Sequence, residues 1–222
     1  MDQIYHSEKT WVYCFITILS ANSGLISAIT LISFINLSSG HMTGNIIYLA
    51  NSILNIDYHD IMLYFTPIGL FFLGAALGGV IIPFNDYTKG KKYQMFFIIS
   101  AIIIFFSMIG LLLNYDSFKY SLSFVLGLQN AFSTHYGQSV ARTTHLTGTL
   151  TDLGFLLTQK FINKVNIQPW KLYVRFLMIF FYFLGAFIGI SLFKTIGYYG
   201  LLLSIIFYMV LLFLNYFNDK SY

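Results

Sequence analysis

The chain has 222 residues, of which 57% are hydrophobic and only 9% are charged. Soluble domains average about 25% charged residues, so this composition excludes a soluble globular protein and indicates an integral membrane protein embedded in a lipid bilayer. The net charge of +4 comes from Lys and Arg residues spread over short loops, which excludes a basic face for nucleic acid. The single Cys14 excludes an intramolecular disulfide.

Six stretches of the sequence are long and apolar enough to form transmembrane helices, which need about 20 residues each. The first exceeds the apolar region of a cleavable signal peptide, about 7–15 residues, so we expect it to remain as a membrane span. Two shorter segments, 42–55 and 145–159, carry Thr, Asn, His or Asp, and their path decides the topology. The six apolar stretches cover residues 11–36, 62–85, 94–114, 118–136, 173–193 and 197–217.

Three short blocks of sequence recur in the same order, which predicts an internal duplication within a single membrane domain, residues 1–222. The two repeats cover about 11–114 and 118–217. The recurring blocks are 24–28 and 127–131, 41–44 and 145–148, and 72–75 and 183–186, at offsets of 103, 104 and 111 residues.

Small and polar residues on the long helices are expected to face the protein interior. Asn22, Ser23 and Ser27 on the first helix have counterparts near Gln129 and Asn130 on the fourth. Glycines follow the small-xxx-small pattern of packed membrane helices. The glycines that we expect at helix contacts are Gly74, Gly78, Gly79, Gly185 and Gly189.

Loop charges distinguish two topologies. If each short segment crosses the membrane, a repeat has four crossings and the copies are parallel; if it enters and returns, a repeat has three crossings and the copies are inverted. Lys and Arg accumulate in cytoplasmic loops. The loop 86–92 is basic while its counterpart holds only Lys194, and the loop 57–60 is acidic while 160–175 is basic. This opposed bias favours an all-α polytopic membrane protein with six transmembrane helices and two re-entrant half-helices in inverted repeats, with both termini cytoplasmic. Eight crossings in parallel repeats are the alternative.

A polar His-x-Thr-Gly motif stands where each short helix is predicted to begin. Re-entrant backbone is tolerated at membrane depth only against protein or a water-filled cavity, and we expect Thr43 and Thr147 to be N-caps. Free N–H groups and the helix dipole attract an anion or polar ligand, and in inverted copies the two ends would meet near mid-depth. The predicted substrate-binding residues are His41, Thr43, Gly44, Asn45, Gln129, Asn130, His145, Thr147, Gly148 and Thr149.

The same motif has a purely structural interpretation, because Thr and Gly often serve close helix packing and an intramembrane His is often a hydrogen-bonded strut. Its presence in both copies favours a functional role. Asp152 is a candidate for ion or proton coupling, since an acidic residue inside a membrane is costly. It would pair with Arg142, or remain solvated if its segment ends near the interface.

Enzymatic activity finds no support in the sequence. The chain lacks a nucleophile elbow, a zinc-protease motif and a phosphate-binding loop, so we expect no catalytic residues and no cofactor. His41, His145 and Asp152 are suitable metal ligands, but they form no local cluster in the sequence and no metal site is predicted.

Several of these motifs resemble the YoaK-like family of bacterial integral membrane proteins. The resemblance implies a bacterial inner membrane and brings no established substrate. Members usually carry an acidic residue in a Gly-x-x-Asp-Ala motif where this chain has Ser27, so a coupling role for that carboxylate does not carry over. The matching stretches are Ser39-Gly40-His41-Met42-Thr43-Gly44-Asn45, Gly127-Leu128-Gln129-Asn130-Ala131 and Thr143-Thr144-His145-Leu146-Thr147-Gly148-Thr149-Leu150-Thr151.

The sequence therefore predicts a small secondary transporter or exporter for a small polar or anionic solute, with its site between the two half-helix ends. A channel-like facilitator and a non-transporting membrane scaffold are the alternatives. A homodimer is compatible with the sequence, although no segment identifies an interface.

Overall fold

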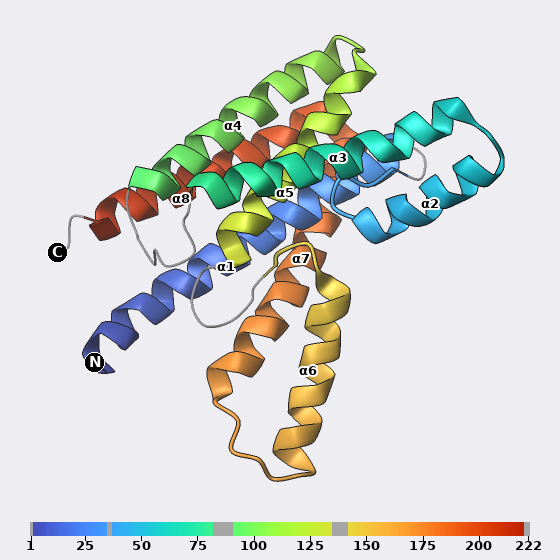
Figure 1. Ribbon diagram of the computed structural model, residues 1–222. Helices are drawn as coiled ribbons and strands as arrows, with labels where there is room; N and C mark the ends of the chain where they lie inside the picture. The colour runs from blue at the N-terminus through green and yellow to red at the C-terminus, as the bar shows by residue number, and fades with distance from the viewer. Residues whose placement is uncertain (1, 35–36, 82–90, 135–141, 220–222) are drawn as a thin grey trace.

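The computed structural model describes residues 2–34, 37–81, 91–134 and 142–219, and all its secondary-structure elements are helices (Figure 1). The predicted all-α class is confirmed for this part of the chain. The α-helices are α1 (Asp2–Ser33), α2 (Met42–Leu54), α3 (Tyr58–Ile81), α4 (Lys91–Leu112), α5 (Lys119–Thr134), α6 (Leu146–Phe161), α7 (Pro169–Ile196) and α8 (Leu202–Asp219). Two 3₁₀ turns, η1 (Asp116–Phe118) and η2 (Gly197–Leu201), precede α5 and α8.

Long apolar helices make up most of the described structure, as expected for a membrane protein. The predicted span 118–136 corresponds to α5, whose described part has 16 residues, and the predicted ends 35–36, 82–85 and 135–136 lie outside the described residues. Four stretches of the described chain are long and apolar enough to cross a membrane: Tyr13–Ser33, Tyr58–Ile81, Lys91–Leu112 and Pro169–Phe217, the last comprising α7, η2 and most of α8.

The two short helices lie close to their predicted positions. α2 has 13 residues and α6 has 16, which corresponds to about 20 and 24 Å at 1.5 Å per residue. Both are shorter than the hydrocarbon core of a bilayer, which is about 30 Å thick. α2 packs on α3 and α6 packs on α7, so that each short helix forms a hairpin with the long helix after it (Figure 1).

The chain folds back on α1 before it enters α2. The backbone N–H of Ser39 donates to Thr30 Oγ1 at 3.1 Å, and Gly40 lies against the side chain of Ser27. These contacts are one to two turns before the end of α1 at Ser33. α2 therefore begins beside the body of α1 and runs outward, and α3 then returns in the direction opposite to α1 (Figure 1).

The main helix pairs combine the two predicted repeats. α1 packs along α7, and α3 packs along α5, while α4 and α8 pack on each other. The first helix of each predicted repeat is thus the partner of the third helix of the other repeat. Figure 1 shows α1 and α5 running in opposite directions through the bundle.

Glycines bring the backbones of these pairs into direct contact. A Cβ on Gly185 would overlap the carbonyl oxygen of Ala21, and a Cβ on Gly189 would lie 2.8 Å from the carbonyl oxygen of Leu25. Residue numbers increase together on both sides of this contact, so α1 and α7 are parallel. The predicted packing role is confirmed for both glycines.

The contact between α3 and α5 repeats this arrangement at the offsets seen in the sequence. A Cβ on Gly74 would overlap the carbonyl oxygen of Phe124, and one on Gly78 would overlap Ala131 and approach Leu128. α3 and α5 are therefore parallel as well. The expectation for Gly79 is wrong, since nothing lies within 4 Å of a Cβ built there. Gly79 is one residue beyond Gly78 and therefore lies on a face of α3 that is turned away from α5.

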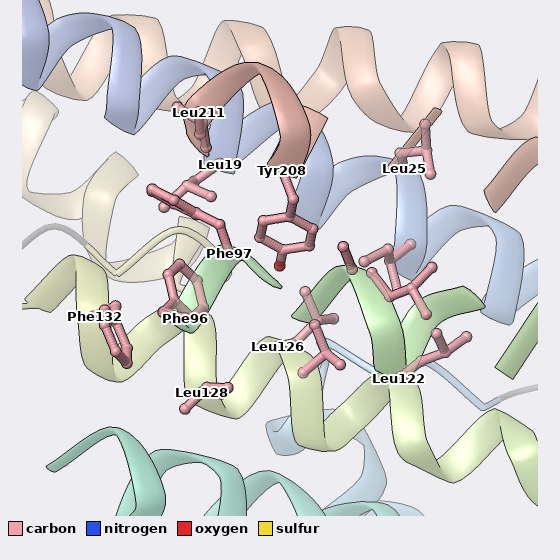
Figure 2. Close-up of a cluster of buried hydrophobic side chains, with 14 of the residues drawn as sticks. Leu19, Leu25, Phe96, Phe97, Leu122, Leu126, Leu128, Phe132, Tyr208 and Leu211 are labelled. Carbon is pink, nitrogen blue, oxygen red and sulfur yellow. The ribbon is translucent and has the colours of Figure 1, made fainter. Parts of the chain in front are cut away.

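Buried aromatic side chains fill the space between α4, α5 and α8. The rings of Phe96 and Phe132 stack with centroids 4.1 Å apart, and the Phe96 ring meets the edge of Tyr208 at 5.7 Å. Figure 2 shows Tyr208 projecting from α8 beside Phe97, with its hydroxyl group directed away from α8. The apolar core thus surrounds a polar group.

We predict that Gly185→Ala and Gly74→Ala destabilise the protein by about 1–3 kcal/mol or more, because the added methyl group must separate two backbones. Gly79→Ala is the matched control. Because Ala has a higher helix propensity than Gly, this substitution should leave stability unchanged or raise it by up to about 1 kcal/mol. The measurement is the thermal unfolding midpoint of the three purified variants in detergent. Equal midpoints for Gly74→Ala and Gly79→Ala would contradict the close packing of α3 on α5.

Candidate functional site

Polar side chains buried among apolar helices form the candidate site. Their hydrogen bonds connect α1, α5 and α8 with the non-helical segment that precedes α6. All are less than one-tenth exposed. We call this group the central polar cluster, and its members are Asn22, Ser23, Gln129, Asn130, Thr143, Thr144, Ser204 and Tyr208.

The side-chain nitrogen of Gln129 connects α5 to two other parts of the chain. Nε2 donates to the carbonyl oxygen of Leu19 at 3.0 Å and to Ser23 Oγ at 2.7 Å, both on α1. It also lies 2.8 Å from Thr143 Oγ1 in the segment before α6. Because an amide nitrogen carries only two hydrogens, these three acceptors fully occupy it.

The side-chain oxygen of Gln129 extends the cluster to α8. Oε1 accepts hydrogen bonds from Asn22 Nδ2 at 2.9 Å and from the Tyr208 hydroxyl at 2.7 Å. Asn22 Oδ1 in turn accepts from the Ser204 hydroxyl. A single fully buried carboxamide therefore organises contacts among three helices.

Asn130 holds the segment before α6. Its Oδ1 accepts from Thr143 Oγ1 at 3.0 Å and from the backbone N–H of Thr144 at 3.3 Å, and its Nδ2 donates to Thr144 Oγ1. Thr143 also lies 2.9 Å from Ser23 Oγ. Backbone that leaves a helix in an apolar interior needs such partners, because no water is available to satisfy it.

The two segments that precede the short helices converge on α1. Gly40 lies against Ser27 so closely that a Cβ would overlap Ser27 Oγ, while Thr143 bonds Ser23. Ser23 and Ser27 are one helical turn apart, about 6 Å along the axis. The backbones of the two predicted repeats thus reach neighbouring turns of the same helix.

The start of each short helix differs from the prediction. The N-cap residues are His41 and His145, neither of which makes a side-chain cap hydrogen bond. The prediction that Thr43 and Thr147 are N-caps is wrong. The residue before each of them already has helical geometry, so each threonine is the second residue of its helix and its hydroxyl cannot reach the first-turn N–H groups as an N-cap side chain does.

The ten predicted binding residues fall into three groups. Gln129 and Asn130 belong to the central polar cluster, and Asn45 and Thr149 are buried in the first turn of α2 and α6. Asn45 Nδ2 donates to the carbonyl oxygen of Ser38 at 3.1 Å, and Thr149 Oγ1 donates to that of His145 at 3.0 Å. The exposed group is His41, Thr43, His145 and Thr147, with Gly44 and Gly148 half-buried.

Asp152 pairs with Arg175 on α7 and not with Arg142. Asp152 Oδ2 lies 3.2 Å from Arg175 Nε and 3.1 Å from Nη2, with the carboxylate more than half exposed. The first half has a ring contact at the equivalent positions, since Tyr48 and Tyr64 stack at 5.1 Å. Each short helix is thus tied to its long neighbour, by charge in one half and by aromatic stacking in the other.

One group of potential metal ligands lies elsewhere, at the start of α3. Ligand atoms of Asp57, His59 and Asp60 lie within 4.8 Å of one another. Asp57 Oδ1, however, already accepts the backbone N–H groups of His59 and Asp60 at 3.1 Å each. This is the hydrogen bonding of a helix N-cap, and it accounts for the acidic residue without a metal ion.

Sequence reasoning missed half of the central polar cluster. Thr143 and Thr144 directly precede the second motif, and their place in the repeat, opposite Ser39 and Gly40, was an available signal. Ser204 and Tyr208 are four residues apart on one face of α8, but an isolated Ser and Tyr in an apolar helix give no indication of their partner.

Long apolar helices that pack around buried, hydrogen-bonded polar groups are typical of polytopic helical membrane proteins. The described structure belongs to this class. The chain belongs to the family described as "Protein of unknown function (DUF1275)". The model of this family matches residues 15–214. No curated protein and no solved structure matches the chain.

We predict that Gln129→Leu destabilises the protein by at least about 1–3 kcal/mol, because Asn22, Thr143 and Tyr208 lose buried partners. Gln159→Leu is the control, since Gln159 accepts an exposed hydrogen bond from Asn163 near the end of α6. Thermal unfolding in detergent should show a large loss for Gln129→Leu only. Similar midpoints for both variants would exclude a structural role for the central carboxamide.

Proposed function

We propose that the protein is a small secondary transporter or exporter of a small polar or anionic solute, of the YoaK-like type, in a bacterial inner membrane. The observation that carries the proposal is the convergence of two non-helical segments on adjacent turns of α1, at Ser23 and Ser27. Irregular backbone inside an apolar bundle characterises transporters, in which it lies at the substrate site.

In this proposal six helices span the membrane as inverted repeats, and α2 and α6 are re-entrant half-helices. Three observations support it: both short helices are shorter than the hydrocarbon core, α1 and α5 run in opposite directions, and the chain folds back on α1 before α2. The loop charges support a cytoplasmic location of both termini.

The proposed moving parts are the parallel pairs α1–α7 and α3–α5. Within each pair, glycines keep two backbones in contact over several turns, which favours motion as a rigid body. Between the pairs, α1 and α5 are linked chiefly by the side chains of the central polar cluster. Rocking of one pair against the other would exchange hydrogen bonds at Gln129 for bonds to solute or water.

The chemistry of the cluster indicates the class of solute. Its members offer amide and hydroxyl groups without a carboxylate, and the start of α6 next to Thr144 presents first-turn N–H groups that the N-cap residue His145 does not cap with its side chain. Such a helix end favours an anion or a polar group. The solute would lie between these N–H groups and the cluster.

A non-transporting scaffold is the second candidate. It is favoured by the saturation of the Gln129 carboxamide, whose hydrogen bonds are all made within the protein. Solute binding distinguishes the two functions, since a scaffold needs no ligand at this position.

We predict that a thermal-shift screen of organic anions and small polar solutes on the purified protein yields a stabilising ligand, because binding to the folded state raises its stability by mass action. Thr147→Val should weaken binding of that ligand at least tenfold, whereas Thr151→Val, one turn later and also exposed, should not. If no solute stabilises the protein, or if both variants bind alike, the scaffold is the better description.

The topology has a separate test in a Cys14→Ser background. We predict that Lys91→Cys reacts with a membrane-impermeant thiol reagent only from the cytoplasmic side, and that Asn55→Cys reacts only from the outside. Both positions are exposed ends of helices. Parallel repeats with eight crossings predict the reverse for both, so the two labels together decide between the topologies.

A further inference from the structure

We propose that the tip of the α6–α7 hairpin binds the phosphodiester headgroups of anionic phospholipids at the membrane surface. The basic tip, defined as residues 160–171, joins the end of α6 to the start of α7 and is the far end of that hairpin (Figure 1). This surface function does not depend on the proposed transport activity.

The tip carries positive charge without nearby acidic sequence. It contains Lys160, Lys164 and Lys171, and no Asp or Glu occurs between Asp152 and Asp219. Asp152 itself is engaged by Arg175. The three ammonium groups therefore have no acidic partner within their own hairpin, and a negatively charged surface complements them.

Exposed apolar side chains alternate with these lysines. Phe161 is 70% exposed, Ile162 72% and Val165 45%. In water such a cluster would be unfavourable, whereas at the edge of a bilayer it is buried among acyl chains. This composition indicates a membrane surface as the partner and argues against a free soluble anion.

Aromatic contacts hold two of the lysines at headgroup level. Lys160 Nζ lies 5.6 Å from the centroid of the Phe161 ring, and Lys171 Nζ lies 5.8 Å from that of Trp170. The Trp170 Nε1–H donates to Gln168 Oε1 at 2.7 Å, which fixes the indole. Trp residues favour the interface between headgroups and hydrocarbon, so the adjacent ammonium groups lie where lipid phosphates are.

The opposite hairpin provides an internal contrast. The α2–α3 tip, residues 55–60, is also exposed and apolar in part, but it carries Asp57 and Asp60 and no lysine. If exposure and apolar character alone caused lipid retention, both tips would bind equally. The charge difference predicts that anionic lipid is held at the α6–α7 tip.

The test compares phosphatidylglycerol with phosphatidylcholine of the same acyl chains, added to the full-length protein in detergent and followed by native mass spectrometry. We expect selective retention of phosphatidylglycerol by the wild type. In the triple variant Lys160→Gln/Lys164→Gln/Lys171→Gln, affinity should fall at least tenfold, since each lysine near an anionic surface contributes about fivefold. The control Lys194→Gln, at the opposite end of α7, should stay within about twofold.

Two further measurements serve as controls for this test. The triple variant should keep the wild-type melting temperature in phosphatidylcholine, which shows that it is folded, and raising the salt should weaken phosphatidylglycerol binding to the wild type several-fold. Undiminished phosphatidylglycerol retention in the triple variant would overturn the proposal. The proposal would also be overturned if inorganic phosphate stabilised the wild type as much as phosphatidylglycerol does, because the ligand would then be a free anion.

Discussion

Unpaired backbone in an apolar interior is the constraint on which this structure depends. The segments before α2 and α6 are not helical, and every buried backbone N–H or C=O group there that lacks a partner is costly. The protein meets this constraint with side chains: Thr30 for the first segment, and Asn130 with Thr143 for the second. The polar residues of α1 and α5 are buried because the two segments need them.

The packing of helices from the first half of the chain on helices from the second half meets a second constraint, the lack of a strong hydrophobic driving force between helices in lipid. Association then depends on close packing and interhelical hydrogen bonds, and the glycines of α3 and α7 supply the closest approach. Since Gly74 meets α5 and Gly185 meets α1, neither half of the chain can form its main helix contacts alone. The two halves are therefore expected to fold together.

Sequence reasoning located elements and local patterns well and long-range partners poorly. Apolar length was sufficient for the long helices, and the short helices agree with the prediction to within two residues at their ends. Residue type suggested an N-cap at Thr147. The helix instead begins at Leu146, directly after Thr143 and Thr144, which are hydrogen-bonded to Asn130. The partner of Asp152 proved to be Arg175, 23 residues later and on another helix, a relation that no helical spacing encodes.

The two hairpins differ in the contact that joins the short helix to the long one. Positions that hold the Asp152–Arg175 ion pair in α6–α7 hold the stacked Tyr48 and Tyr64 rings in α2–α3. An ion pair that is half exposed contributes little in water, about 0–1 kcal/mol, and it weakens with salt, whereas stacked rings do not depend on salt in this way. The α6–α7 hairpin is thus the half whose internal tie can respond to its ionic surroundings. It also follows directly on the segment that carries Thr143, which is hydrogen-bonded within the central polar cluster.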